Sequence, residues 1–126
     1  MLENSKAFSS FSVDDLSKAH QFYGTTLGLN VNEDAMGLHL SLSGGSEVFV
    51  YAKPNHQPAS FTVLNFLVDN IDATVDALVE RGVAFEQYHS EMIKTDSKGI
   101  ARSDPAKGPN IAWFKDPAGN IVAVLQ

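Results

Sequence analysis

The chain has 126 residues, of which 44% are hydrophobic and 19% charged, a composition typical of one globular domain. It contains no cysteine, which excludes disulfides and thiolate chemistry, and its formal net charge of -6 argues against binding to nucleic acid backbones. No apolar run approaches the roughly 20 residues that span a bilayer. The first residues lack the basic and apolar regions of a signal peptide. We therefore expect a soluble, cytoplasmic protein with no nucleic acid or membrane partner.

The sequence contains an internal repeat. Residues 11–16 read Phe-Ser-Val-Asp-Asp-Leu, and residues 66–71 read Phe-Leu-Val-Asp-Asn-Ile, 55 positions later. In each copy, alternating apolar residues predict a strand that leads into a helix with a short polar cap, which Asp14, Asp15 or Asp69 would supply. The helical apolar pattern stops at Gly28 in the first copy and at Gly82 in the second.

Three further strands are predicted after each helix. The first of them is expected at residues 29–32 in one copy and 83–86 in the other. A hairpin follows in each copy, with strands at residues 38–42 and 48–51 and at residues 111–114 and 121–125. The second copy carries an insertion between about Tyr88 and Lys107, which predicts a long polar loop.

These motifs, with Phe22-Tyr23, Leu27-Gly28-Leu29 and the Trp-Phe-Lys-Asp-Pro-Ala-Gly-Asn run at 113–120, resemble the vicinal oxygen chelate superfamily. That superfamily includes glyoxalase I, the bleomycin-resistance proteins and the extradiol dioxygenases. The resemblance implies an α+β fold of two tandem βαβββ modules that form a curved, mostly antiparallel sheet around a cavity, usually completed in a homodimer. We expect a single domain over residues 1–126, with module 1 at about 6–53 and module 2 at about 60–126.

The resemblance also locates a metal site that this sequence has lost. In metal-dependent members, four side chains from the first and last strands of the two modules bind one divalent ion. The corresponding positions here are Phe8, Phe49, Val63 and Ala123. None of these side chains offers a lone pair to a metal. We therefore expect neither a metal nor another cofactor.

Strand alternation places a mainly apolar and aromatic set on the face that would line the cavity. The predicted ligand-binding residues are Phe8, Ser10, Ser12, Phe49, Tyr51, Val63, Asn65, Trp113, Ala123 and Leu125. This mixture is typical of a small-molecule pocket. The alternative is a solid core, which the three polar members disfavour because buried polar groups need partners. The loop at 88–107 is expected to lie over the mouth and to be mobile.

Other reactive side chains show no revealing spacing. No serine or histidine pattern indicates a nucleophile and its base. His39 alternates with Leu38 and Leu40, so it lies on the opposite strand face, most simply as an exposed or hydrogen-bonded histidine. The basic residues of the long loop, among them Lys98 and Arg102, alternate with acidic ones, so a solvated loop is favoured over an anion site.

The leading hypothesis is a metal-free protein of the glyoxalase and bleomycin-resistance type that binds an apolar or aromatic small molecule as a homodimer. Binding alone would be its activity, so no catalytic residue is assigned. One alternative is a metal-dependent lyase or dioxygenase with displaced ligands, drawn from His39, Glu47 or Glu91. Another is a dimeric scaffold without a ligand.

Overall fold

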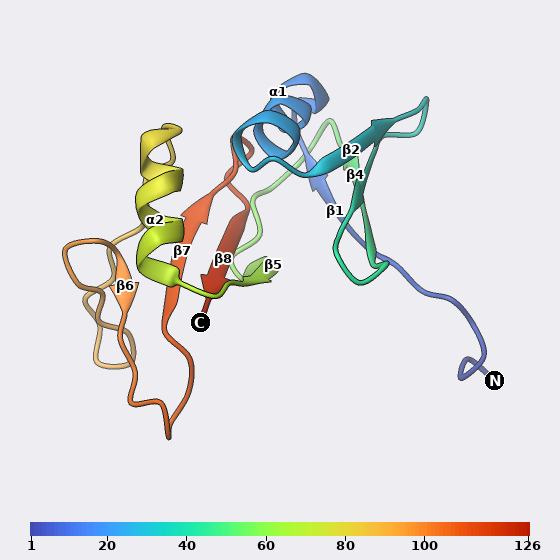
Figure 1. Ribbon diagram of the computed structural model, residues 1–126. Coiled ribbons are helices and arrows are strands. Elements are labelled where there is room, and N and C mark those ends of the chain that lie inside the picture. The colour runs from blue at the N-terminus through green and yellow to red at the C-terminus, as the bar shows by residue number, and fades with distance from the viewer. The chain divides into compact units, whose positions relative to one another are not determined.

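The computed structural model describes residues 1–126 and divides the chain into two units, Met1–Gln57 and Pro58–Gln126. Each unit contains one four-stranded sheet and a helical segment (Figure 1). The fold class is α+β with two similar modules, as predicted. The strands form two separate sheets, neither of which closes on itself. None of the helices has the length and apolar content that a membrane span requires.

The first unit follows the predicted order of strand, helix and three strands. Its elements are β1 (Ser9–Val13), α1 (Leu16–His20), the π-helix η1 (Gln21–Thr26), β2 (Asn30–Glu33), β3 (Leu38–Ser41) and β4 (Glu47–Ala52). The strand order is β1-β4-β3-β2, with β1 parallel to β4 and the other pairs antiparallel. The second half of the predicted helix is π-helical, because the Leu27 N–H donates to the Phe22 carbonyl five residues back.

The second unit repeats this topology. Its elements are β5 (Thr62–Leu67), α2 (Ile71–Glu80), β6 (Ile100–Ala101), β7 (Ile111–Lys115) and β8 (Ile121–Leu125). The strand order is β5-β8-β7-β6, with β5 parallel to β8 and the other pairs antiparallel.

The strand predicted at residues 83–86 is wrong. Phe85 makes only an isolated bridge to Phe114 of β7, and the edge of the sheet is completed by β6, inside the predicted loop. The chain leaves the edge after Phe85 and returns at Gly99, where a Cβ atom would lie 2.9 Å from the Phe85 Cβ. Glycine at a φ of 85° allows this close return. The edge strand is therefore split into two short pieces.

Both helices begin at a polar cap. Asp15 accepts a hydrogen bond from the Lys18 N–H, and Asn70 accepts one from the Ala73 N–H. The prediction of Asp15 as a cap is confirmed. In the second copy the cap is Asn70 rather than Asp69, because the residue directly before the helix is the one whose side chain reaches the free N–H groups.

The register of the parallel strand pairs shows the repeat directly. Ser10 lies opposite Phe49 in the first unit, and Asn65 lies opposite Ala123 in the second. The next pairs on the same face are Ser12 with Tyr51, and Leu67 with Leu125. Ser10 and Asn65 are separated by the same 55 positions as the repeated sequence motif. Corresponding residues of the two copies therefore occupy corresponding places in the two sheets.

Each sheet has one face covered by the helical segment of its own unit. In the first unit, α1 contacts β4 and η1 contacts β2, and the fully buried side chains are Tyr23, Leu38, Leu40 and Val50. In the second, α2 contacts β7 and β8 over Ile71, Val75, Phe114 and Val122. Since side chains alternate along a strand, the predicted ligand residues of β1, β4, β7 and β8 point to the opposite, helix-free faces.

Candidate functional site

The helix-free face of the first sheet carries three ring side chains side by side. His39 of β3 lies opposite Phe49 of β4 in the strand register, and Tyr51 follows on the same face. The ring centroids of His39 and Phe49 are 5.1 Å apart, and those of Phe49 and Tyr51 are 6.0 Å apart with planes at 17°. All three rings are half-buried. We call this set, His39, Phe49 and Tyr51, the ring row.

Two serines border the ring row. The register places Ser10 of β1 opposite Phe49, and Ser12 opposite Tyr51. Ser10 is exposed and Ser12 is half-buried. The face thus offers stacked aromatic surface with hydroxyl groups at its edge, which suits an aromatic molecule with a few polar substituents.

His39 is fixed by two carboxylates. Its Nε2 lies 2.8 Å from Asp34 Oδ2, and its Nδ1 lies 3.5 Å from Glu47 Oε1. The backbone N–H of Met36, and after it the hydrogen bond from His39, hold the pKa of Asp34 below its usual range. The prediction that His39 faces away from Leu38 and Leu40 and is hydrogen-bonded is confirmed. Both of its nitrogens are engaged within the protein.

Sequence reasoning missed a serine–histidine pair on this face. The Oγ of Ser12 lies 2.7 Å from the Nδ1 of His56, which follows β4 at the end of the first unit. The two residues are separated by 44 positions, so no spacing pattern could reveal the contact. After β4 the chain turns across the end of β1, where the Lys53 N–H donates a hydrogen bond to the Val13 carbonyl. This turn brings Ser12 and His56 together.

The helix-free face of the second sheet is built from the equivalent positions. Asn65, Ala123 and Trp113 lie side by side in the register. The Trp113 and Tyr88 rings meet edge to face with centroids 5.5 Å apart. Asn65 is exposed, whereas Ala123 is fully buried. Trp113 therefore takes the place in this unit that His39 takes in the first.

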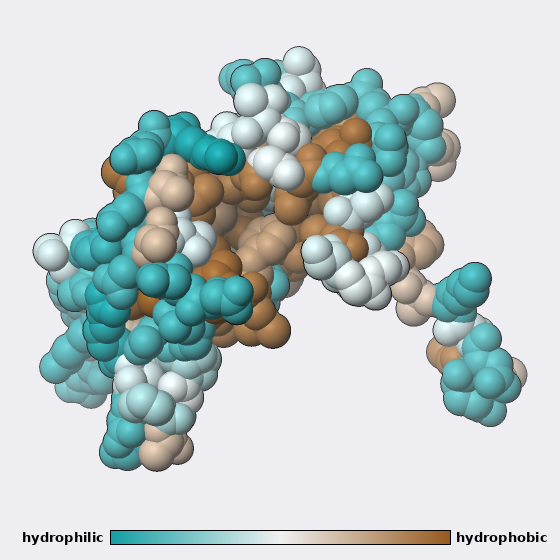
Figure 2. Space-filling view, viewed as in Figure 1, coloured by the Kyte–Doolittle hydropathy of each residue, from teal (hydrophilic) through white to brown (hydrophobic).

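Two predicted lining residues, Phe8 and Val63, lie outside the regular strand pairing. Phe8 precedes β1 and is 66% exposed, within a solvent-open hollow of about 740 Å³ that the N-terminal segment forms with the β3–β4 turn. Val63 has no register partner on β8, because the pairing shifts between Thr62 and Leu64. Leu125 is half-buried opposite Leu67, which is 87% exposed. Figure 2 shows apolar surface over the strands of each unit.

The positions at which the sequence resemblance implies a metal do not fit one here. Phe49 and Ala123 lie at the equivalent register positions of β4 and β8, and Phe8 and Val63 lie near the starts of β1 and β5. Their side chains contain only carbon and hydrogen, so they supply no ligand atom. No group of three or more His, Asp or Glu side chains is placed to hold an ion elsewhere in residues 1–126.

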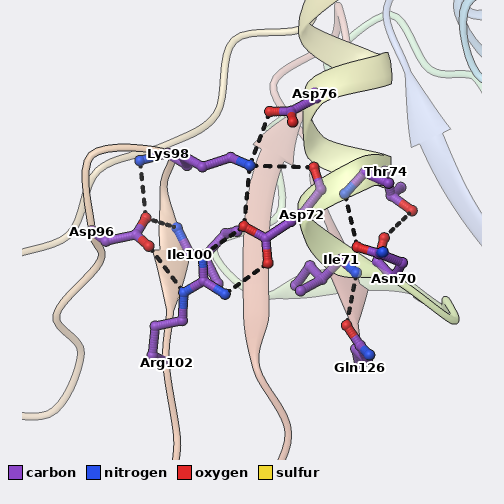
Figure 3. Close-up of polar contacts among 11 residues, drawn as sticks. Asn70, Ile71, Asp72, Thr74, Asp76, Asp96, Lys98, Ile100, Arg102 and Gln126 are labelled. Carbon is purple, nitrogen blue, oxygen red and sulfur yellow. Dashed lines mark hydrogen bonds and ion pairs between the residues drawn. The ribbon is translucent and has the colours of Figure 1, made fainter.

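The long loop is tied to α2 by ion pairs (Figure 3). Asp72 of α2 binds Arg102 at 2.8 Å and Lys98 at 3.1 Å, and Asp76 binds Lys98 at 2.9 Å. Arg102 also binds Asp96 at 3.0 Å. Hydrogen bonds from Arg102 and then from Lys98 hold the pKa of Asp72 well below its usual range. These two loop cations therefore bind the protein's own carboxylates, and the prediction of a merely solvated loop needs correction here.

Two four-stranded βαβββ units, with side chains that carry no ligand atoms at the implied metal positions, define a glyoxalase-type fold. The family model of the Glyoxalase/Bleomycin resistance protein/Dioxygenase superfamily matches residues 8–124, so the chain belongs to that superfamily. The resemblance seen in the sequence is thereby confirmed.

Solved structures agree with this assignment. TnmS3, an antibiotic binding protein from Streptomyces sp. CB03234, is 26% identical over 98% of this chain and 97% of its own, with a TM-score of 0.67. A glyoxalase/bleomycin resistance protein from the same organism is 27% identical over 95% and 100%, with a TM-score of 0.63. The glyoxalase family protein from Enterococcus faecalis, 19% identical with both chains fully covered, has a TM-score of 0.72 and shows the fold alone. No curated protein matches the chain.

Proposed function

We propose that the protein binds a small, mainly apolar or aromatic molecule and does so without a metal ion. The observation that carries this proposal is the ring row, which places stacked, half-buried rings on the helix-free face of the first sheet. Aromatic walls with a few polar groups are typical of small-molecule sites. The superfamily membership and the likeness to an antibiotic binding protein support the same class of activity.

The proposed binding face of each unit has aromatic side chains and polar groups. Phe49 and Tyr51 supply flat surface against which an aromatic ligand stacks, and Trp113 supplies the same in the second unit. Ser10 and Ser12 are the proposed hydrogen-bonding groups on the face of the first unit, and Asn65 is the proposed one on the face of the second. The remaining proposed lining residues, which add apolar contact area, are Phe8, Val63, Ala123 and Leu125.

The metal-dependent alternative has less support from the site. Both ring nitrogens of His39 face carboxylates at 2.8 Å and 3.5 Å, an arrangement that satisfies the histidine within the protein. A metal would have to take one of those nitrogens from its carboxylate. We therefore propose binding rather than metal-assisted chemistry.

The proposed assembly is a homodimer with an apolar interface. Large apolar side chains stand exposed on the second unit, with Phe61 at 68% and Leu67 at 87%. Exposed apolar groups of this size favour burial against a partner. Sedimentation at micromolar concentration should show a dimer, and a single species near 13.6 kDa would contradict this part of the proposal. The cytoplasmic location stays a prediction.

A thermal-shift panel tests the binding proposal. Apolar and aromatic antibiotics are added singly in the presence of EDTA, and a molecule that binds only the folded chain raises the melting temperature. Each hit is then tested with Phe49→Ala, which removes the centre of the ring row and should weaken binding about tenfold or more. Phe22→Ala is the matched control, since Phe22 packs on the helical side against Tyr23. A panel without any hit would favour the scaffold alternative.

A further inference from the structure

Ser12 and His56 have the geometry of a nucleophile and its base. Ser12 Oγ and His56 Nδ1 are 2.7 Å apart, which is within hydrogen-bonding distance. When the ring proton is on Nε2, Nδ1 accepts the hydrogen bond from the hydroxyl group. This is the contact through which a neutral histidine withdraws a proton from serine.

The protein holds His56 in place through its backbone. The His56 N–H donates to the Lys53 carbonyl at 3.0 Å, and the Lys53 N–H donates to the Val13 carbonyl at 3.0 Å. Val13 is the residue after Ser12, so the two bonds tie the histidine's turn to the strand that carries the serine. Both side chains are half-buried. Backbone hydrogen bonds therefore fix the positions of the two residues relative to each other.

The fold does not require this pair. Leu67 takes the place of Ser12 in the second unit, with Leu125 opposite it where the first unit has Tyr51. The same register position therefore accepts an apolar side chain in the same type of sheet. The Ser12–His56 pair is therefore specific to the first unit, where it lies beside the stacked rings of Phe49 and Tyr51.

We propose that Ser12 is an acyl acceptor and His56 its general base, acting on esters that have an aromatic leaving group. Ser12 Oγ attacks the ester carbonyl carbon while its proton passes to His56 Nδ1. The bond from that carbon to the aryl oxygen breaks, and the aryloxide takes the proton from His56. Water then attacks the acyl-serine, His56 accepts the water proton, and the proton returns to Ser12 Oγ as the acid leaves. Tyr51, opposite Ser12, provides a surface for the aryl group.

The probe is p-nitrophenyl acetate, added to the full-length chain. Release of p-nitrophenolate is followed by absorbance, and the acetylated residue is located by peptide mass spectrometry. In samples quenched before the acyl-serine hydrolyses, we expect acetyl-Ser12 to form faster than acetyl-Ser10. Ser10 is the internal control, since it lies on the same strand face and is the more exposed of the two. Exposure alone would favour Ser10, whereas activation by His56 favours Ser12.

Two variants test the role of the base. A general base contributes about 10²–10⁴-fold to such a step, so His56→Gln should slow Ser12 acetylation about 100-fold or more. His20→Gln is the matched control, because His20 is a half-buried histidine of the same unit that pairs with Glu33 instead. Circular dichroism checks that each variant is folded.

Two results would overturn the proposal, and the first of them needs no variant. An initial rate of Ser10 acetylation equal to or greater than that of Ser12 in the unmodified chain would show that Ser12 is not activated. Acetylation of Ser12 at an unchanged rate in the folded His56→Gln variant would equally remove His56 as its base. Ligand binding to the ring row does not depend on either result.

Discussion

Gly37 is the position where a single added carbon should disturb the proposed site most. It lies directly before β3, it is buried, and its φ of 153° is one that L side chains rarely adopt. A Cβ atom there would collide with the carbonyl oxygen of Val50 and lie 3.2 Å from the Phe49 ring. The carbonyl belongs to β4, so the strand itself would have to move. Gly37→Ala should therefore displace the centre of the ring row.

The expected loss of stability is the sum of two effects. Overpacking against a fixed neighbour costs about 1–3 kcal/mol, and the unfavourable backbone conformation costs about 1–3 kcal/mol. For a chain of this size, about 4 °C of melting temperature corresponds to 1 kcal/mol. We therefore expect Gly37→Ala to lower the melting temperature, followed by circular dichroism, by about 10 °C or more.

Gly44→Ala is the matched control. Gly44 has a φ of 89° and no neighbouring atom within 4 Å of an added Cβ, so only the backbone effect applies. Its melting temperature should fall by clearly less than that of Gly37→Ala. Equal losses in the two variants would refute the role of the close approach to β4.

Asp72→Asn should destabilise the fold more than Asp76→Asn in thermal melts, because Asp72 binds two cations and Asp76 only one. The folded state lowers the pKa of Asp72, so the stability that its ionised carboxylate adds is present above the ordinary pKa of about 3.9 and is lost as the pH falls towards the folded value. The difference in melting temperature between Asp72→Asn and the wild type should therefore shrink at about pH 2. A difference that stays constant with pH would contradict this. Phe114→Ala should cost about 3–5 kcal/mol in urea unfolding, since Phe114 is 1% exposed, and a loss below about 1 kcal/mol would contradict its place in the core. For a ligand found by screening, Trp113→Ala should weaken binding by about 1–3 kcal/mol in calorimetry. Asn65→Leu should change which ligands bind while the melting temperature stays close to the wild-type value, because Asn65 is exposed; the reverse pattern would place Asn65 in the core.

The sequence predicts the repeated part of this protein well, because the repeat and the strand alternation are local. The 55-residue offset correctly pairs Ser10 with Asn65, and alternation correctly separates Phe49 from its buried neighbours Val48 and Val50. The metal positions at Phe8, Phe49, Val63 and Ala123 are what the family resemblance implies, and the repeat adds that they correspond between the two copies. Each of these features depends on residues that are close in sequence or related by the repeat.

The missed features depend on contacts between distant residues. β6 has two residues in a polar segment, and its place at the sheet edge depends on Gly99 passing Phe85 and on the ion pair of Arg102 with Asp72. The contact of Ser12 with His56 depends on how the chain turns after β4. Periodicity does not contain such information, since each contact occurs in one copy without a counterpart in the other.

Calorimetric titration of one ligand from the screening panel tests the central claim most directly. The titration is carried out with the wild-type chain in EDTA, with the same chain in added Zn²⁺ or Mn²⁺, and with Phe49→Ala in EDTA. Metal-independent binding to the ring row predicts the same affinity in the first two titrations and an affinity about tenfold or more weaker in the third. Binding that disappears in EDTA, returns with the metal and is unaffected by Phe49→Ala would contradict the account.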